Sequence, residues 1–362
     1  MSLGHYVTML RNGASGHRGV SGHGTMFGQM MTATLADEIL TDAPGGVRAL
    51  FCIGANPANA LPDQRYAIEA LRALDLLVTS EPVWSETARL ADIVFAVKQP
   101  FERPDHTQFL EGLGLEIPFA QYTPALVPPP AGSDVVDDWM VYYALAQRLG
   151  LQLGLGVPVD MERTPDSDDL LELLTTGATV PLDTVRACPA GAVFDRPAPT
   201  ILPAREGRDA RLALAPDDVL AELDACRDGL SGRPDMAATH LLVARRERET
   251  MNSFGRDLAV TRRRFPTNPA WMHPDDLAAL SLTDGARVRI SVDHDSIVAE
   301  VRGDASVRRG VVSMSHGWGG LMTDDAAQEG ASTTRLVARD RAVQAINAMP
   351  RLSAIPVIVS PL

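Results

Sequence analysis

Cysteine is scarce in this sequence, and its distribution excludes several kinds of site. The 362 residues include three cysteines, Cys52, Cys188 and Cys226. They form no Cys-x-x-Cys pair and have no histidine at ligand spacing, which excludes a local zinc or iron–sulfur motif in this chain. Cys52 lies in an apolar run, where we expect a small core residue. So little cysteine is typical of a reducing compartment, and we expect a cytoplasmic protein.

Long apolar runs and an excess of positive charge are also missing. No stretch approaches the roughly 20 apolar residues of a membrane span, and the N-terminus has no basic-then-apolar signal pattern. The formal net charge is −13, which argues against non-specific nucleic-acid binding, because that binding needs Lys and Arg to neutralise phosphates. We therefore expect neither a membrane nor nucleic acid as a partner.

The sequence does contain the pattern of a parallel α/β sheet. An apolar run over 49–53 meets Gly54 and then the turn Asn56-Pro57. A helical pattern over 66–74 and a second apolar strand over 74–79 follow. In such sheets ligands lie beyond the carboxyl ends of the strands. A ligand-binding turn and a purely structural turn are both consistent with this pattern, because Gly-x-Asn-Pro alone is a weak signal.

A third strand is predicted further along the same sheet. Trp84–Asp92 is predicted to be a helix, with Ser85 as its N-cap and Glu86 complementing its positive end. The strand over 92–97 follows, with Glu102 just beyond it, where strand ends carry chemistry. Glu102 is also consistent with a simple turn cap.

The rest of the chain divides into a connecting region and a β-rich region. Residues 151–235 are rich in Pro, Asp and Gly and are predicted to be an insert, whereas the short strands of 236–362 suggest a small β-barrel. We therefore expect an α/β domain over 4–150, the insert, and a barrel domain. The further helices are predicted over 34–40, 138–149, 167–174, 216–226 and 275–282, and the further strands over 241–244, 287–293, 296–302, 311–315 and 355–359.

Residues 4–32 are rich in glycine and histidine. A Gly-rich stretch can cradle phosphate through its backbone N–H groups, but it is equally consistent with a loop. Its three histidines, His5, His17 and His23, lack ligand partners at close spacing, so we expect no metal site. Met1-Ser2-Leu3 is typical of an expression vector, and the motif starting at Gly4 suggests a fragment of a longer chain.

Taken in order, these segments resemble the C-terminal half of the molybdopterin oxidoreductases, a family that includes formate dehydrogenases, nitrate reductases and dimethyl sulfoxide reductase. Each motif is weak alone, but their order and spacing from 54 to 319 are specific. The matching motifs are Gly54-Ala-Asn-Pro57, Ser85-Glu-Thr-Ala88 with Ala91-Asp92, Glu102, Asp137-Asp-Trp139, Ala244-Arg245 with Asn252-Ser253, His273–Asp276 with Leu282-x-Asp-Gly285, and His316-Gly-Trp-Gly319.

The resemblance implies a fold and a cofactor. The family combines a Rossmann-like domain with a C-terminal double-psi β-barrel and binds molybdenum or tungsten between two molybdopterin guanine dinucleotides. Glu81 stands where the family often has an aspartate that reads the guanine edge, and Ser85 and Thr87 would lie near phosphate or ribose. The turn at 54–57 would approach the guanine nucleotide, and residues of the last domain would face the pterins. The implied cofactor contacts are Gly54, Asn56, Pro57, Glu81, Ser85, Thr87, Arg245, Thr250, Asn252, Ser253, His316 and Trp318.

The sequence also departs from the family. The iron–sulfur cysteines and the metal-ligating residue lie upstream in the family and are absent here, and Thr334 replaces the usual asparagine. We therefore expect no catalytic and no metal-ligating residue, no redox activity from this chain alone, and an iron–sulfur cluster only upstream. The partners would be the missing N-terminal domains or a catalytic chain. The intact enzyme would be formate dehydrogenase-like or nitrate reductase-like.

Alternatives remain at this point. The chain could be a non-catalytic cofactor-binding or assembly module that docks to a separate catalytic chain. The central domain of a thiamine-diphosphate enzyme has a similar sheet, although the terminal barrel pattern argues against it. Individually, Trp318 could be a core residue, His316 is expected to form hydrogen bonds and not to ligate metal, and Arg245 could join a solvated ion-pair face with Glu247 and Glu249.

Overall fold

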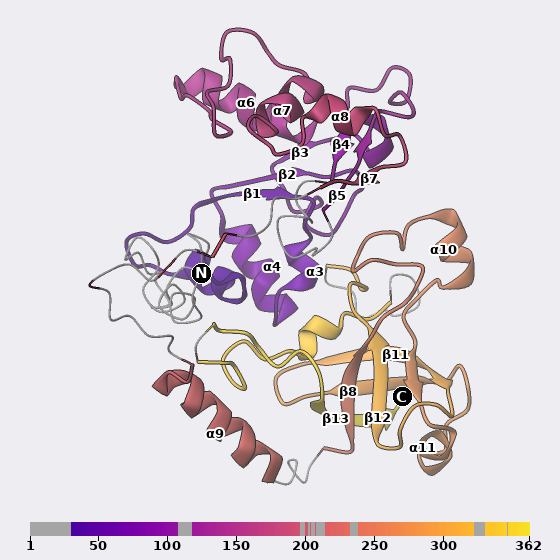
Figure 1. Ribbon diagram of the computed structural model, residues 1–362. Coiled ribbons are helices and arrows are strands. Elements are labelled where there is room, and N and C mark those ends of the chain that lie inside the picture. The colour runs from indigo at the N-terminus through magenta and orange to yellow at the C-terminus, as the bar shows by residue number, and fades with distance from the viewer. Residues whose placement is uncertain are drawn as a thin grey trace.

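The computed structural model shows a mixed α/β protein that combines a parallel sheet with a closed β-barrel (Figure 1). It describes residues 30–107, 118–195, 200–201, 203, 207, 214–231, 238–321, 330–345 and 347–362. The glycine-rich stretch and its three histidines lie outside the described residues, except for the last few positions of that stretch. No helix in the described part of the chain is long and apolar enough to cross a membrane.

The parallel sheet has three strands in the order β1-β2-β3, which are Ala49–Ile53, Leu76–Ser80 and Ile93–Phe95. Helix α4 (Gln64–Ala73) connects the first two strands, and the Asp63 side chain caps its N-terminus by accepting from the amide of Tyr66 at 3.3 Å. This confirms the predicted strand, turn, helix and parallel strand. The core under the sheet consists of Cys52, Ala58, Ile68, Leu71 and Leu77.

The predicted helix over Trp84–Asp92 is wrong. The segment forms consecutive turns, in which the amide of Arg89 donates to the carbonyl of Ser85 at 3.0 Å. The Ser85 hydroxyl does act as a cap, because it accepts from the amide of Ala88 at 3.2 Å. The Thr87 side chain bonds to Asn56, and the Glu86 side chain bonds to Asn56 and Arg256. These tertiary hydrogen bonds compete with a regular helix.

Two groups of helices cover the two sides of the sheet. Helices α3 (Pro57–Ala60) and α4 lie between the sheet and the barrel, whereas α6 (Asp138–Leu149) lies on the other side, where Tyr142 packs on Phe51 with ring centroids 6.2 Å apart (Figure 1). The other elements before the barrel are η1 (Thr32–Thr34), α2 (Leu35–Leu40), η2 (Pro100–Glu102), β4 (Asp105–His106), β5 (Phe119–Ala120), β6 (Tyr122–Thr123), α7 (Ser167–Leu174), α8 (Leu182–Arg186), β7 (Ala192–Val193) and α9 (Asp217–Ser231).

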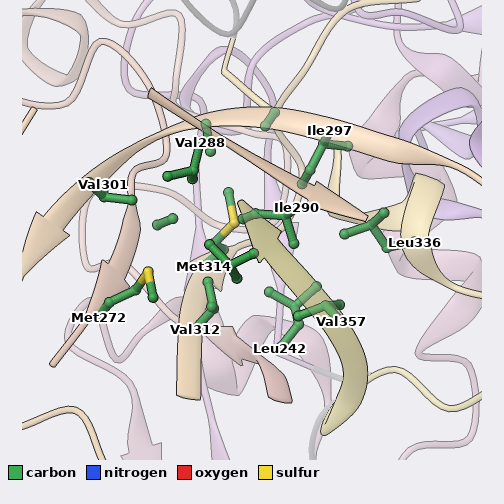
Figure 2. Close-up of a cluster of buried hydrophobic side chains, with 14 of the residues drawn as sticks. Leu242, Met272, Val288, Ile290, Ile297, Val301, Val312, Met314, Leu336 and Val357 are labelled. Atoms are coloured by element: carbon green, nitrogen blue, oxygen red, sulfur yellow. The ribbon is translucent and has the colours of Figure 1, made fainter. Parts of the chain in front are cut away.

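The barrel closes in the order β10-β11-β9-β12-β8-β13, and β13 pairs with β10. Its pairs are antiparallel except β11 with β9 and β12 with β8. Figure 2 shows the interior, where Met272, Ile290 and Met314 pack among other apolar side chains. The elements are β8 (His240–Arg245), α10 (Ala259–Arg264), β9 (Ala270–Met272), α11 (Pro274–Ala279), β10 (Arg287–Ser291), β11 (Ser296–Gly303), β12 (Val311–Ser315), η3 (Thr333–Leu336) and β13 (Ile355–Pro361).

Buried hydrogen bonds join the sheet region to the barrel region. The Nε of Arg335 donates to the Gln64 side chain at 2.8 Å, and both residues are almost fully buried. The Asn59 side chain donates to the carbonyl of Gly319 at 3.2 Å. These contacts hold the barrel beside the carboxyl edge of the sheet.

Candidate functional site

A cavity of about 800 Å³ lies between the carboxyl edge of the parallel sheet and the barrel. Its walls come from the loops that follow β1, β2 and β3 and from the barrel loops that follow β8 and β12. Its volume is within the range of roughly 300–1,000 Å³ that is typical of small-molecule sites. The residues predicted to bind a cofactor that line this cavity are Gly54, Asn56, Glu81, Ser85, Asn252, Ser253 and His316.

The other predicted residues do not line this cavity. Thr87 is fully buried, and its hydroxyl donates to the Asn56 side chain at 2.8 Å. Arg245 pairs with Glu247 at 3.2 Å, as the ion-pair alternative requires, and stacks over the Trp271 ring. A cofactor role for these residues stays a prediction, as it does for Pro57, Thr250 and Trp318.

The loop after β1 is shaped by Gly54 and Asn56. Gly54 has a φ of +53°, and no atom lies within 4 Å of the position that a Cβ would take, so its backbone faces open space. The Asn56 side chain donates to Glu86 at 2.7 Å and accepts from the amide of Thr87 at 3.1 Å. These bonds occupy the Asn56 amide with protein partners, so its evident role is to fix the shape of the loop.

Glu86 forms a buried ion pair with Arg256 of the barrel region. Their side chains are 3% and 10% exposed, and Arg256 also donates to the carbonyl of Gly317 at 2.7 Å. An ion pair taken out of water is retained only when its remaining hydrogen bonds are well satisfied. The sequence-based prediction missed Arg256, because the residue carries no motif and its partner lies 170 positions away.

Glu81 is the residue of the cavity with the most perturbed ionisation. Burial and, secondarily, the like charge of Glu86 raise the pKa of the Glu81 carboxyl to about 7. Burial also raises the pKa of Cys52, with a contribution from Glu81, to about 11. Among the residues that the structure describes, the buried Oε2 of Glu81 has no hydrogen-bond partner. A buried acceptor of this kind is a good site for N–H donors of a ligand.

The loop after β3 brings two cations to the same edge of the sheet. The Nζ of Lys98 pairs with Asp137 at 2.8 Å, and Nη1 of Arg103 pairs with Asp138 at 3.0 Å. The Nε of Arg103 is buried and has no hydrogen-bond partner in the described part of the chain. The sequence-based prediction chose Glu102 here, but its carboxylate accepts from the amide of Gln99 at 2.8 Å and caps the turn. The signal that could have found Lys98 is its position directly after the predicted strand over 92–97.

The barrel wall of the cavity presents hydrogen-bond donors around Asn252. Its side-chain oxygen accepts from Arg246 at 2.8 Å and lies 2.9 Å from Nε2 of His316. Because Arg only donates, this atom is the amide oxygen, and His316 therefore carries its proton on Nε2. Burial and the charge of Arg246 lower the pKa of His316, so its ring is neutral at neutral pH. Within the described ranges, no carboxylate forms an ion pair with Arg246.

Two further observations concern the family departures. Thr334, which replaces the usual asparagine, lines the cavity, and its hydroxyl lies 2.9 Å from that of Ser332. In the part of the chain that the structure describes, no group of three or more His, Cys, Asp or Glu side chains is arranged to hold a metal ion.

The barrel and its loops match a known cofactor-binding domain. Residues 241–356 match a family model described as "Molydopterin dinucleotide binding domain". This match covers the strands β8 to β12 and the loops with Arg246, Asn252 and His316. The barrel region thus matches a molybdopterin dinucleotide-binding domain, and the curated relatives include subunits of a formate dehydrogenase and of another oxidoreductase. The resemblance found in the sequence is confirmed.

Individual relatives agree with this assignment. The alpha subunit of an NADPH-Fe(3+) oxidoreductase from Geobacter sulfurreducens is 25% identical over 248 residues, which are 68% of this chain and 24% of that protein. The F420-dependent formate dehydrogenase subunit alpha of Methanocaldococcus jannaschii is 28% identical over 113 residues, 31% of this chain and 16% of that protein. Both matches therefore span less than a quarter of the relative's length.

A solved structure shows the same fold. Acetylene hydratase from Pelobacter acetylenicus is similar with a TM-score of 0.71 and 18% sequence identity, over 94% of this chain and 47% of that one. The chain therefore has the fold of about half of that protein.

Proposed function

We propose that this chain binds the guanine nucleotide end of a molybdopterin guanine dinucleotide in the cavity between the sheet and the barrel. The observation that carries this proposal is the position of Glu81, whose unpartnered carboxylate oxygen lies at the carboxyl edge of the parallel sheet, in the same cavity as the dinucleotide-binding barrel. The barrel would then be a double-psi barrel and the sheet a Rossmann-like domain, with domain boundaries at 4–150, 151–235 and 236–362.

The sheet wall would hold the base. A carboxylate accepts N–H donors from a purine and offers none of its own when ionised. Ser85 lies in the same wall, although its hydroxyl already accepts from a backbone amide. Gly54 leaves open space in front of the loop after β1, which lets backbone approach the nucleotide.

The barrel wall would hold the negatively charged part of the cofactor. Arg246 offers a planar set of donors and has no ion-pair partner among the described residues, which suits a diphosphate. The Asn252 side chain bonds to both Arg246 and neutral His316 and so holds them side by side. Ser253 follows Asn252 in the same loop. These donors can position a diphosphate and the pterin that follows it.

The chain would act as the cofactor-holding part of a molybdenum or tungsten oxidoreductase. When bound, the metal–dithiolene group supplies the electron transfer, and the residues of this chain bind, orient and shield it. Similarity to the alpha subunit of an F420-dependent formate dehydrogenase supports a formate dehydrogenase-like enzyme. The metal ligand, an iron–sulfur cluster and the second nucleotide half-site would lie in other segments or in a partner chain.

A thermal-melt titration with GDP tests this proposal. A ligand at a hundred times its dissociation constant stabilises the folded state by about 2.7 kcal/mol, which corresponds to a rise of about 3 °C for a chain of this size. We expect GDP to raise the melting temperature, and ADP and thiamine diphosphate to have little effect. No shift at millimolar GDP, or a response to thiamine diphosphate alone, would contradict the proposal.

A further inference from the structure

We propose that Arg103 is a second base-reading residue, whose Nε–H donates to the carbonyl oxygen of the purine that Glu81 binds through its N–H groups. This inference rests on the proposed function. It concerns a residue outside every motif that the sequence analysis singled out. Two of its supports are the unpartnered Nε atom and the place of Arg103 in the cavity wall.

The first observation is a complementary pair of unsatisfied atoms. In the described part of the chain, the buried side-chain atoms without a hydrogen-bond partner belong to Thr79, Glu81, Arg103, Asp137 and Trp318. Of these residues, Glu81 and Arg103 line the cavity between sheet and barrel. Native proteins seldom leave buried polar atoms unsatisfied. One of the two atoms accepts and the other donates, so the partner must offer both a donor and an acceptor.

The second observation is that the topology places both residues at one edge. Glu81 directly follows β2, and its amide donates to the carbonyl of Phe95, the last residue of the neighbouring β3, at 3.0 Å. Arg103 comes after β3 and the short η2 turn. Because the strands are parallel, both residues lie where such sheets bind ligands.

The third observation is the charge balance, which selects a neutral acceptor. Lys98 pairs with Asp137, and Arg103 pairs with Asp138, so each cation of this loop already has a carboxylate. A phosphate would gain little net attraction here, whereas Arg246 on the barrel wall pairs with no carboxylate of the described residues. The ion pair through Nη1 also fixes the guanidinium of Arg103 and leaves its Nε to donate to a carbonyl oxygen.

A guanine-type edge meets these requirements. It offers the N1–H and N2–H donors beside the O6 acceptor, so a carboxylate and an Nε–H donor can bind side by side. Adenine has an amino donor in place of O6 and would set its donor against the Arg103 donor. Glu81 as an acceptor and Arg103 as a donor therefore each favour guanine over adenine.

Titration calorimetry with matched nucleotide analogues tests the role of Arg103. In 6-thio-GDP the O6 acceptor is replaced by a weaker sulfur, whereas IDP keeps O6 and N1–H but lacks the N2 amino group. We expect the wild-type chain to bind GDP about 10-fold more tightly than either analogue. Arg103→Met should weaken GDP binding about 10- to 100-fold and abolish the preference for GDP over 6-thio-GDP, with the preference over IDP intact.

Controls separate a specific role from a structural one. Arg163→Met removes a comparable ion pair outside the cavity, at 2.8 Å to Asp169, and should leave all affinities unchanged. Arg103→Lys keeps the positive charge without the Nε donor and should lose the same preference if the methionine variant is unstable. If a folded Arg103 variant still binds GDP more tightly than 6-thio-GDP, the inference is overturned but the proposed function is not. Failure of the wild-type chain to bind any guanine nucleotide would overturn both.

Discussion

Replacing Glu81 by glutamine should stabilise the ligand-free chain at alkaline pH and weaken its binding of guanine nucleotides. Burial and the nearby carboxylate of Glu86 raise the pKa of Glu81 from 4.5 to about 7. Because the pKa is higher in the folded than in the unfolded chain, the contribution of Glu81 to stability is fully present below pH 4.5. It is lost as the pH rises through 7, where the carboxylate ionises in the folded state.

The magnitude follows from the size of this pKa shift. At about 1.36 kcal/mol per pKa unit the shift corresponds to about 3 kcal/mol, and solvent screening of this partly exposed side chain reduces it to about 1 kcal/mol. Urea unfolding should therefore find Glu81→Gln more stable than the wild type by about 1 kcal/mol at pH 8 and nearly equal to it at pH 4.5. A variant that is less stable at pH 8, or a difference that does not change with pH, would refute this reasoning.

The same group gives GDP binding a defined pH dependence. Glu81 accepts N–H donors with both oxygens only when it is ionised, so the affinity of the wild-type chain should fall as the pH drops below 7, by up to about tenfold for each pH unit. Cys52, with a pKa of about 11, stays protonated in this range, and Glu86 is engaged in its ion pair with Arg256.

Calorimetry from pH 5 to pH 8 measures this slope, and Glu81→Gln is its control. The ligand's own phosphate, with a pKa near 6, affects both proteins equally, so the ratio of their affinities isolates the carboxylate. An identical slope in the two proteins would contradict the assignment of Glu81.

Two other predictions concern the remaining contacts of the cavity. Glu86→Gln removes the shorter of the two ion pairs of buried Arg256 and leaves the one with Asp257 at 3.9 Å. It should cost about 3 kcal/mol in urea unfolding, whereas the double variant with Arg256→Met should recover much of this loss. Additive losses would count against the ion pair. Arg246→Met should weaken GDP binding about tenfold in calorimetry and leave the melting temperature unchanged. Its control is Arg248→Met, which changes an exposed neighbour and should not alter the affinity for GDP. Equal losses of affinity in both variants would indicate a non-specific charge effect.

The sequence predicted the local elements well, because their signals are local. The strand Ala49–Ile53, the helix Asp138–Leu149 and the strand Val311–Ser315 have the predicted bounds. Each is an apolar or amphipathic run that ends at a glycine or a polar turn. The predicted helix over Trp84–Asp92 failed for the opposite reason, since its side chains bond to residues far away in the sequence.

The candidate site was predicted only in part. The family motifs led to Glu81, Asn252 and His316, which do line one cavity. Arg103 and Arg256 were missed because their roles depend on partners from other elements, such as the Asp138 carboxylate at the start of α6. A linear pattern does not record which charges remain unpaired after folding.

Lys98 allows a direct test of whether the cavity holds a guanine nucleotide, because it is the single lysine in the sequence. Its side chain is partly exposed, lines the cavity and pairs with Asp137. Acetylation by an amine-reactive reagent, followed by mass spectrometry, gives the modification rate of Lys98, with the terminal amine as an internal reference. The account predicts that saturating GDP slows modification of Lys98 several-fold and that ADP at the same concentration does not. An unchanged rate with GDP, or equal protection by ADP, would contradict it.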